Sequence, residues 1–404
     1  KTSSNRKPLR RTKRKSTKLS EGVAKQASHL ASNMREAMVK VTKMRRVERR
    51  NRETVAIAKT TPAMTLKRLV RPEQVGDLMG RLNRSLNFDL GIDLGTANIL
   101  IFAKGKGLVL DEPAYISRDD KTGDILALGE AARSMVGRTP KGISVIRPVQ
   151  AGVIADYDMT EFMLKYFIRS VVPASRLMKT RIIVCVPSGI TPVEKRAILE
   201  ALLRTGAKKT VLIEEPLAAA MGVDIGGGTT DIAVLCDTGV VVSESLRIGG
   251  DSFNESIIRY IRRKKRLVIG PLTAEKIKIS VGTVDRRAKE RTIEVRGRDA
   301  SSGLPKMVAV NSLEIQRALE AQVMNILEGI KSILEKTPPE LAINDHGIIL
   351  TGGGALIDGL DRVITRSVGI ASYLVESPRY AVIKGVAKAL DEMSQLRDTL
   401  DELQ

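Results

Sequence analysis

The sequence predicts an α/β fold made of two similar halves, and two observations carry this prediction. From Leu90 onward, short runs rich in β-branched residues alternate with helix-like patterns, as where TRIIVCVPSG is followed by TPVEKRAILEALLRTG. Strands that alternate with helices indicate sheets buried between layers of helices. In addition, a strand-and-turn string occurs twice, as GIDLGTAN at 91–98 and in altered form as VDIGGGTTD at 223–231. A recurring string of this kind indicates two copies of one structural unit.

Composition limits the class of protein. A chain of 404 residues with 43% apolar side chains is long enough for two or three domains with sizeable cores. The two cysteines form no disulfide framework, and Cys185 lies in the apolar run RIIVCVP, where a buried thiol is expected. No run reaches the roughly 18 apolar residues of a spanning helix, and no signal peptide is recognisable. We therefore expect a cytoplasmic protein.

The net charge of +21 is concentrated in one segment. Residues 1–88 hold 24 Lys and Arg against 6 Asp and Glu, whereas the rest of the chain is nearly neutral. Basicity therefore describes an N-terminal extension and not the body. Within this extension, residues 1–20 are polar and predict disorder, and apolar periodicity predicts helices at about 22–50 and at 73–86. For the first helix, packing against a partner and direct contact with membrane or nucleic acid both stay open.

The repeated string has a chemical interpretation. A strand that ends in aspartate and turns through glycine and threonine presents consecutive backbone amides on one concave face, because glycine permits positive φ and close backbone approach. Such a turn suits phosphate oxygens, and the aspartate suits Mg²⁺ held through water, since this cation takes oxygen ligands and keeps much of its hydration shell. The Walker A string is absent. Two facing turns would grip a polyphosphate from both sides, with TGGGA at 351–355 following a third apolar strand.

A family resemblance extends this interpretation. The strings that carry it include CVPSGITPVEKRAI, IEEPLAAA, VDIGGGTTDIAV, TAEKIK, EVRGRDASSGLPK and LTGGGALIDGLD. In uninterrupted order over residues 88–391, the sequence resembles the MreB/Mbl family, the bacterial actins that form cell-shape filaments. The resemblance implies an actin-like ATPase fold, in which duplicated ribonuclease-H-like halves surround a nucleotide cleft.

The resemblance also implies domain limits. The first half would comprise 89–222 plus about 377–395, with a small subdomain at about 113–150. The second half would comprise 223–376, with a small subdomain at about 252–322.

Individual residues acquire roles from the same resemblance. ATP and Mg²⁺ are the implied ligands, with Asp93 and Asp224 on the metal side through water. Glu275 and Lys278 are one helical turn apart, so both can face the nucleoside. The implied nucleotide-binding residues are Gly95, Thr96, Ala97, Asn98, Gly226, Gly227, Gly228, Thr230, Glu275, Lys278, Gly352, Gly353, Gly354 and Ala355.

Two carboxylates precede Pro216 in the IEEP string. The resemblance implies that Glu215 positions the attacking water, aided by Thr229, because phosphoryl transfer depends mainly on positioning and charge neutralisation. Glu214 is the less favoured member of the pair. The alternative for both is a solvated or helix-capping carboxylate.

The sequence departs from the family at two places. A linker that family members carry between the helix after EEP and the second turn is missing at Gly222–Val223, and PPELAINDHG is also short. Either a segment is absent there or the cleft is distorted. Residues 1–72 match no part of the family, whereas the apolar stripe at 75–86 takes the place of its membrane anchor, with arginines that suit anionic lipid.

We expect, from the resemblance, a filament-forming cytoskeletal protein at the inner face of the cytoplasmic membrane. It would direct wall synthesis and rod shape with slow ATP hydrolysis, and its partners would be further copies of itself and the wall-elongation proteins MreC, MreD and RodZ. The alternatives are a small-molecule kinase on the same fold and a DNA-segregating actin. Nucleic acid is unexpected for the body and stays possible for residues 1–72.

Overall fold

The structure is a computed structural model that describes residues 89–173, 180–219, 222–236, 239–342 and 347–392, together with the backbone of 401–402. These residues belong to the nearly neutral body of the chain. The predicted disorder at 1–20 and the predicted helices at 22–50 and 73–86 lie outside the described residues.

The first large sheet has six strands in the order β19-β10-β9-β1-β2-β3. Strand β1 pairs antiparallel with β2 and parallel with β9, which in turn is parallel to β10. The strands are β1 (Leu90–Leu94), β2 (Asn98–Ala103), β3 (Gly107–Pro113), β9 (Arg181–Val186), β10 (Lys209–Glu214) and β19 (Asp401–Glu402).

Strand β9 shows why this sheet is covered on both faces. Successive side chains of a strand point to opposite faces, and RIIVCV is apolar at every position after the first. Ile182, Val184 and Val186 pack in one core with α4 (Tyr157–Val171) and α6 (Pro192–Leu203). Ile183 and Cys185 pack in another core with α7 (Glu215–Ala219) and α13 (Ala381–Asp391). Cys185 is buried and free, as predicted.

The second large sheet repeats this arrangement with five strands in the order β13-β12-β11-β17-β18. Strand β11 pairs antiparallel with β12 and parallel with β17, just as β1 pairs with β2 and β9. The strands are β11 (Val223–Ile225), β12 (Thr230–Cys236), β13 (Gly239–Leu246), β17 (Ile348–Thr351) and β18 (Ser372–Leu374). The shared pairing pattern confirms that the two halves are structural repeats.

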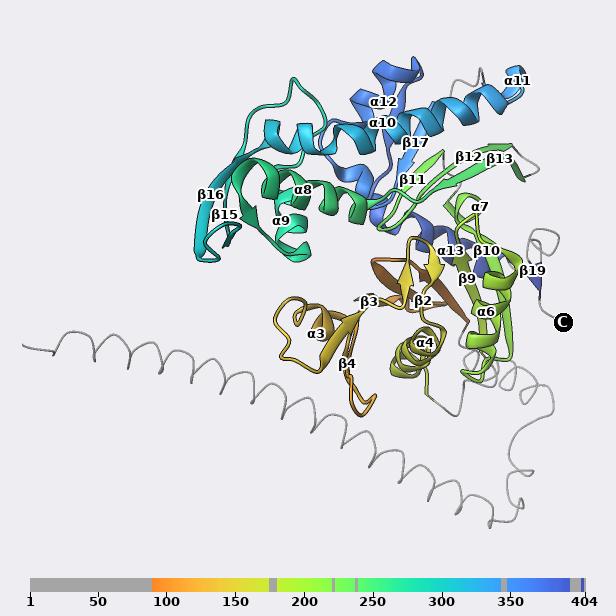
Figure 1. The fold of residues 1–404 in the computed structure, drawn as a ribbon. Helices are drawn as coiled ribbons and strands as arrows, with labels where there is room; N and C mark the ends of the chain where they lie inside the picture. Colours follow the sequence, from red (N-terminus) through yellow and green to blue (C-terminus); the bar gives the residue numbers. More distant parts are fainter. Residues whose placement is uncertain are drawn as a thin grey trace, which may run out of the picture. The chain divides into compact units, whose positions relative to one another are not determined.

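Helices α8 (Gly250–Lys265), α10 (Ser312–Lys336) and α12 (Leu360–Val368) share one apolar core with the second sheet (Figure 1). Helix α10 begins at a capping box in which Asn311 and Glu314 satisfy each other's backbone amides. Within the described residues, no helix is both long enough and apolar enough to cross a membrane.

Two smaller sheets accompany the large ones. The first is β5-β4-β6, made of β4 (Ile116–Asp119), β5 (Ile125–Leu128) and β6 (Ile143–Ile146), and α3 (Gly129–Arg133) follows β5. The second is β14-β15-β16, made of β14 (Leu267–Val268), β15 (Thr292–Asp299) and β16 (Pro305–Asn311), beside α8 and α9 (Pro271–Val281). The remaining short elements are β7 (Val149–Gln150), β8 (Val153–Ile154), α11 (Pro339–Ala342), η1 (Gly354–Leu356) and η2 (Pro378–Tyr380).

Candidate functional site

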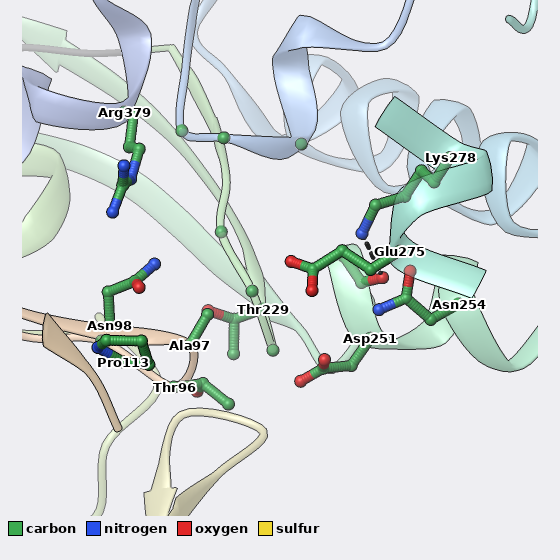
Figure 2. Close-up of a pocket in the computed structure, with 18 of the residues that line it drawn as sticks. Thr96, Ala97, Asn98, Pro113, Thr229, Asp251, Asn254, Glu275, Lys278 and Arg379 are labelled. Atoms are coloured by element: carbon green, nitrogen blue, oxygen red, sulfur yellow. Dashed lines mark hydrogen bonds between the residues drawn. The ribbon is translucent and has the colours of Figure 1, made fainter. Parts of the chain in front are cut away.

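A cavity of about 910 Å³ opens where the strand ends of the two large sheets meet. Both repeated turns line it, together with the glycine segment after β17 and one face of α9 (Figure 2). The sequence-predicted residues that line it are Asp93, Gly95, Thr96, Ala97, Asn98, Glu215, Asp224, Gly226, Gly227, Gly228, Thr229, Glu275, Lys278, Gly352, Gly353 and Gly354. Residues from both halves of the chain therefore converge on one space, even though the junction before Val223 is short.

The first turn connects β1 to β2 and carries side chains. The hydroxyl of Thr96 accepts a hydrogen bond from the backbone amide of Gly152 at 3.0 Å, which ties the turn to the β7–β8 hairpin. A Cβ at Gly95 would lie 2.8 Å from the carbonyl oxygen of Asn98, so only glycine fits there.

The second turn connects β11 to β12 and is bare backbone at 226–228. The amide of Gly226 donates to the carbonyl of Thr229 at 2.9 Å, which closes the turn. The amides of Gly250 and Asp251, in the first turn of α8, donate to the carbonyls of Gly226 and Gly227. The N-terminus of α8 therefore holds the turn in place with amides that would otherwise lack partners.

The glycines of the second turn allow the two turns to touch. A Cβ at Gly227 would lie 2.5 Å from the Cβ of Ala97, and one at Gly228 would lie 2.6 Å from the hydroxyl oxygen of Thr96. None of the glycines at 95 and 226–228 has a positive φ. Of the two reasons expected for glycine in these turns, positive φ does not apply and close approach does: a Cβ at Gly95, Gly227 or Gly228 would meet another atom at 2.8 Å or less, whereas one at Gly226 would meet nothing closer than 3.4 Å.

Four carboxyl groups gather around this contact. The pKa of Asp224 is raised to about 7, by burial first and then by the nearby Asp231 and Asp93, while the hydroxyl of Thr351 donates to Asp224 Oδ1 at 3.0 Å and opposes the shift. Burial also raises the pKa of Asp93 to about 7. The pKa of Glu215 is raised well above its usual range by burial first and then by the three aspartates.

This surplus of negative charge fits a divalent cation. Two carboxylates facing a polar cavity are oxygen ligands of the kind that Mg²⁺ takes, and a cation there would offset the cost that raises their pKa values. In the described parts of the chain, no three His, Cys, Asp or Glu side chains converge as a metal site by themselves. Phosphate and water would have to complete the coordination.

Helix α9 forms the opposite wall of the cavity. Glu275 and Lys278 both face inward, as their spacing predicts (Figure 2). Lys278 Nζ donates to the carbonyl of Gly250 at 2.8 Å, and burial lowers its pKa. Glu275 Oε2 accepts a hydrogen bond from Arg133 at 2.7 Å.

The glycine segment after β17 packs against the end of β11, where the second turn begins. Gly352 has a φ of +82°, and a Cβ there would collide with the carboxylate of Asp224 and the carbonyl of Ile225. A Cβ at Gly354 would collide with the Ile225 side chain, whereas a Cβ at Gly353 would meet nothing within 4 Å.

Two predicted site residues do not line the cavity. Thr230 is fully buried and donates its hydroxyl hydrogen to the carbonyl of Ile248 at 2.7 Å. It is the first residue of β12, and adjacent side chains on an extended chain point to opposite sides, so Thr229 faces the cavity and Thr230 faces away. Ala355 is 4% exposed and packs in the core of the second half.

Sequence reasoning missed several polar residues that line the cavity. Arg133, Arg147 and Tyr115 come from the region of the first small sheet, and Asp251 and Asn254 come from α8. Asp251 ends the string RIGGD and Arg147 begins the string RPVQAGVIADY, both of which also resemble the family, and these strings were the available signals. Arg379 also lines the cavity and pairs with Asp111 at 2.5 Å.

Two α/β repeats whose strand-end turns meet at one cavity define an actin-like protein. The family model described as MreB/Mbl protein matches residues 87–398. The cell shape-determining protein Mbl of Bacillus cereus is 48% identical over 323 residues, which cover 76% of this chain and 97% of that protein. The cell shape-determining protein MreB of Escherichia coli K12 is 46% identical over 323 residues, covering 75% and 93%. The chain belongs to the MreB/Mbl family.

Solved structures agree with this assignment. The crystal structure of MreB5 of Spiroplasma citri bound to ADP has a TM-score of 0.73 and 33% identity, covering 77% of this chain and 98% of that one. A MamK double helical filament has a TM-score of 0.64 at 21% identity, covering 76% of this chain and 99% of that one, and this likeness shows the fold alone.

The alignment with Mbl bears on the short junction. It spans 323 residues but covers 76% of this 404-residue chain, which is fewer than 323 of its residues. The relative therefore has positions within the matched region that this chain lacks. This agrees with the expectation of an absent segment.

Proposed function

We propose that this chain is an ATP-binding, filament-forming protein that determines cell shape and hydrolyses ATP slowly. One observation carries the proposal: the two repeated turns contact each other in a cavity that also holds Asp93, Asp224 and Glu215. Relatives that are 42–48% identical are named for cell-shape determination, and MreB5 of Spiroplasma citri was crystallised with ADP and with AMPPNP.

The phosphates of ATP would lie against the two turns. Backbone amides of the two turns would bind phosphate oxygens, and Asp93 and Asp224 would hold Mg²⁺ through water. Such a cation neutralises phosphate charge during phosphoryl transfer. Glu275 and Lys278, across the cavity on α9, would contact the nucleoside.

Hydrolysis requires a water molecule positioned next to the terminal phosphate. Glu215 is 7% exposed, lines the cavity and stands at the start of α7, directly after β10. Thr229, at the end of the second turn, also lines the cavity. We assign Glu215 to positioning the water, and Asp231, which is buried beside it with an unpaired carboxylate oxygen, to the same polar cluster.

The remaining parts of the proposal concern assembly and location. Copies of the chain would polymerise at the inner face of the cytoplasmic membrane and organise wall synthesis together with MreC, MreD and RodZ-type proteins. Support for this comes from membership of the MreB/Mbl family, whose relatives carry cell-shape names.

Sedimentation tests the proposal against the kinase alternative. The full chain is centrifuged with ATP·Mg²⁺, with ADP·Mg²⁺ and without nucleotide, and parallel reactions supply sugars and polyols as phosphate acceptors. We expect ATP-dependent pelleting and no phosphorylated acceptor. Phosphorylation of a sugar without any sedimentable polymer would overturn the proposal.

A further inference from the structure

Two ion pairs span the cavity between its opposite walls. Arg133 Nη2 lies 2.7 Å from Glu275 Oε2, and Arg147 Nη1 lies 2.6 Å from Asp251 Oδ2. All four side chains line the cavity, and none of them is more than one-third exposed. Partial burial of this kind makes an ion pair stronger than a fully exposed surface pair, because water and salt screen it less.

The partners come from different halves of the chain. Arg133 ends α3 and Arg147 follows β6, so both arginines belong to the region of the first small sheet. Glu275 lies on α9 and Asp251 in the first turn of α8, beside the second small sheet. Each pair therefore links the two small-sheet regions across the cavity.

Each arginine also has a second partner on its own wall. Arg133 Nη1 lies 3.1 Å from Glu130, one helical turn away on α3. The Arg147 guanidinium lies 5.7 Å from the centre of the Tyr115 ring, a cation–π contact. If the walls separate, neither cation becomes fully unpartnered, which lowers the cost of opening.

The two pairs have different neighbours within the cavity. The amide of Asp251 is bonded to Gly227 of the second turn, so the Arg147–Asp251 pair lies at the phosphate end. Glu275 lies one helical turn from Lys278 (Figure 2). The Arg133–Glu275 pair therefore lies at the proposed nucleoside end. A ligand held between the turns and α9 would thus be enclosed by both pairs.

We propose that Arg133 and Arg147 are positioning residues that hold the cavity closed over its ligand and set the rate at which nucleotide leaves. This inference rests on the proposed function, because the ligand is ATP. It adds a role for four residues. Two of them, Arg133 and Arg147, lie in the region of the first small sheet. Since the pairs are electrostatic, the rate of nucleotide loss should also depend on ionic strength.

Dissociation of a fluorescent ATP analogue from the full chain tests this inference. N-methylanthraniloyl-ATP is bound with Mg²⁺ and displaced by excess ATP. We expect Arg147→Ala and Asp251→Asn each to speed dissociation about 5- to 20-fold, and the double variant to be no faster than either one, because contacting partners are not additive. The charge exchange Arg147→Asp with Asp251→Arg should restore most of the wild-type rate.

Two controls separate this role from a general loss of structure. Arg196→Ala removes a fully external ion pair with Glu200 on α6 and should leave the dissociation rate unchanged. Raising salt from about 50 mM to about 500 mM should speed dissociation from the wild type but not from Arg133→Ala/Arg147→Ala, in which no pair is left to screen. Additive single effects, no rescue by the charge exchange, or equal salt dependence in both proteins would overturn the inference.

A measurement without nucleotide keeps the inference distinct from the proposed function. In the absence of ligand, Arg133→Ala/Arg147→Ala should show faster amide hydrogen exchange at 93–98 and 224–230 than the wild type, because the cavity opens more often. Failure of the wild type to bind the analogue would overturn the proposed function. Unchanged exchange in the variant would overturn the closing role of the two pairs.

Discussion

The two turns of the cavity share one order of strand, aspartate and glycine, yet they present different surfaces. The first turn carries the side chains of Thr96, Ala97 and Asn98, whereas the second is bare glycine at 226–228. A Cβ on Gly227 would occupy space that the Ala97 side chain already fills. The duplicated unit is therefore not used symmetrically, because one copy supplies side chains and the other supplies the backbone surface that fits them.

The acidic groups follow the same division. Asp93 is the single carboxylate of the first turn, whereas Asp224, Asp231 and Glu215 adjoin the second. Asp231 and Asp224 raise the pKa of Glu215, and Asp231 raises that of Asp224. We infer that both turns bind phosphate but that hydrolysis depends on groups at the second. Substitutions at and around each turn test this difference.

The largest effect is expected at Glu215. Glu215→Gln keeps the side-chain volume but removes the charge that would orient water, so ATP hydrolysis should slow by about 10²–10⁴-fold. Nucleotide affinity should change little. Single-turnover phosphate release and equilibrium binding of the same protein measure the two quantities separately.

Glu214 provides the matched control for this substitution. It precedes Glu215 directly but does not line the cavity, and its carboxylate lies 3.6 Å from Lys195 Nζ. Glu214→Gln should leave hydrolysis near the wild-type rate. An equal loss of hydrolysis rate in both variants would show that Glu215 has no special role in hydrolysis.

The contact between the turns gives the next largest effect. In Gly227→Ala the new methyl group meets Ala97 at 2.5 Å, and the backbone nitrogen of Ala97 lies within 3.1 Å of it. Overpacking of this kind costs about 1–3 kcal/mol, so ATP affinity should fall by up to roughly 100-fold. Isothermal titration with ATP·Mg²⁺ measures it.

A second substitution tests whether the cause is this contact. Ala97→Gly removes the side chain that the new methyl group meets, so Gly227→Ala/Ala97→Gly should recover part of the lost affinity. The recovery should be incomplete, because the backbone of residue 97 stays close. No recovery at all would show that glycine at 227 serves the ligand directly and not the neighbouring turn.

Much of this arrangement was predictable from the sequence. The repeated string located both turns, and the alternation of strands with helices indicated the α/β class, because each signal depends on local residue order. Of the two reasons expected for the glycines, only close approach applies, and the sequence did not name the residues approached, because contact between segments far apart in the chain is a tertiary fact whereas positive φ is a local one. Thr230 was assigned to the cavity although strand alternation already opposed that assignment.

The cross-cavity pairs were not predictable. Arg133 and Glu275 are far apart in the sequence, and Arg133 lies in a segment whose charges are typical of a solvated surface. Only the packing of two small-sheet regions beside the cavity brings them together. Family strings located Glu275 by resemblance, but they contained no indication of the arginine that it contacts.

A third prediction compares the two aspartates through stability. Burial raises the pKa of Asp224 to about 7, above its ordinary value of about 4. Between these values the folded chain retains a proton that the unfolded chain has released, so stability is full below about pH 4 and is lost as the pH rises through about 7. Asp224→Asn removes this penalty and should stabilise the metal-free, nucleotide-free chain by about 1–3 kcal/mol at pH 8.

The expected difference in stability between Asp224→Asn and the wild type vanishes toward pH 4 and below, where residue 224 becomes neutral in the folded and the unfolded chain of both proteins. Urea unfolding at pH 8 and at pH 4 measures this difference. Asp93→Asn should gain a similar amount, because burial raises the pKa of Asp93 to about 7 as well. Both variants should bind ATP more weakly with Mg²⁺. A loss of stability in Asp224→Asn at pH 8 would contradict the conclusion that the buried, ionised carboxylate of Asp224 destabilises the folded chain.

The smallest effect concerns the glycine segment that supports the second turn. A methyl group at Gly353 meets nothing within 4 Å, and its φ of −68° suits any residue. Gly353→Ala should therefore change the free energy of unfolding by less than about 0.5 kcal/mol. Because the residue lines the proposed nucleoside end, the methyl group should still weaken ATP binding by about 1 kcal/mol.

Gly354→Ala is the opposite case in the adjacent position. Its methyl group would collide with Ile225 at the base of the second turn, so unfolding should become easier by about 1–3 kcal/mol. Thermal unfolding and ATP titration of both variants separate the two roles, since one glycine faces the ligand and the other faces the protein. Unchanged ATP affinity in Gly353→Ala would show that this glycine segment does not contact the nucleoside. Its role would then be limited to packing against the second turn.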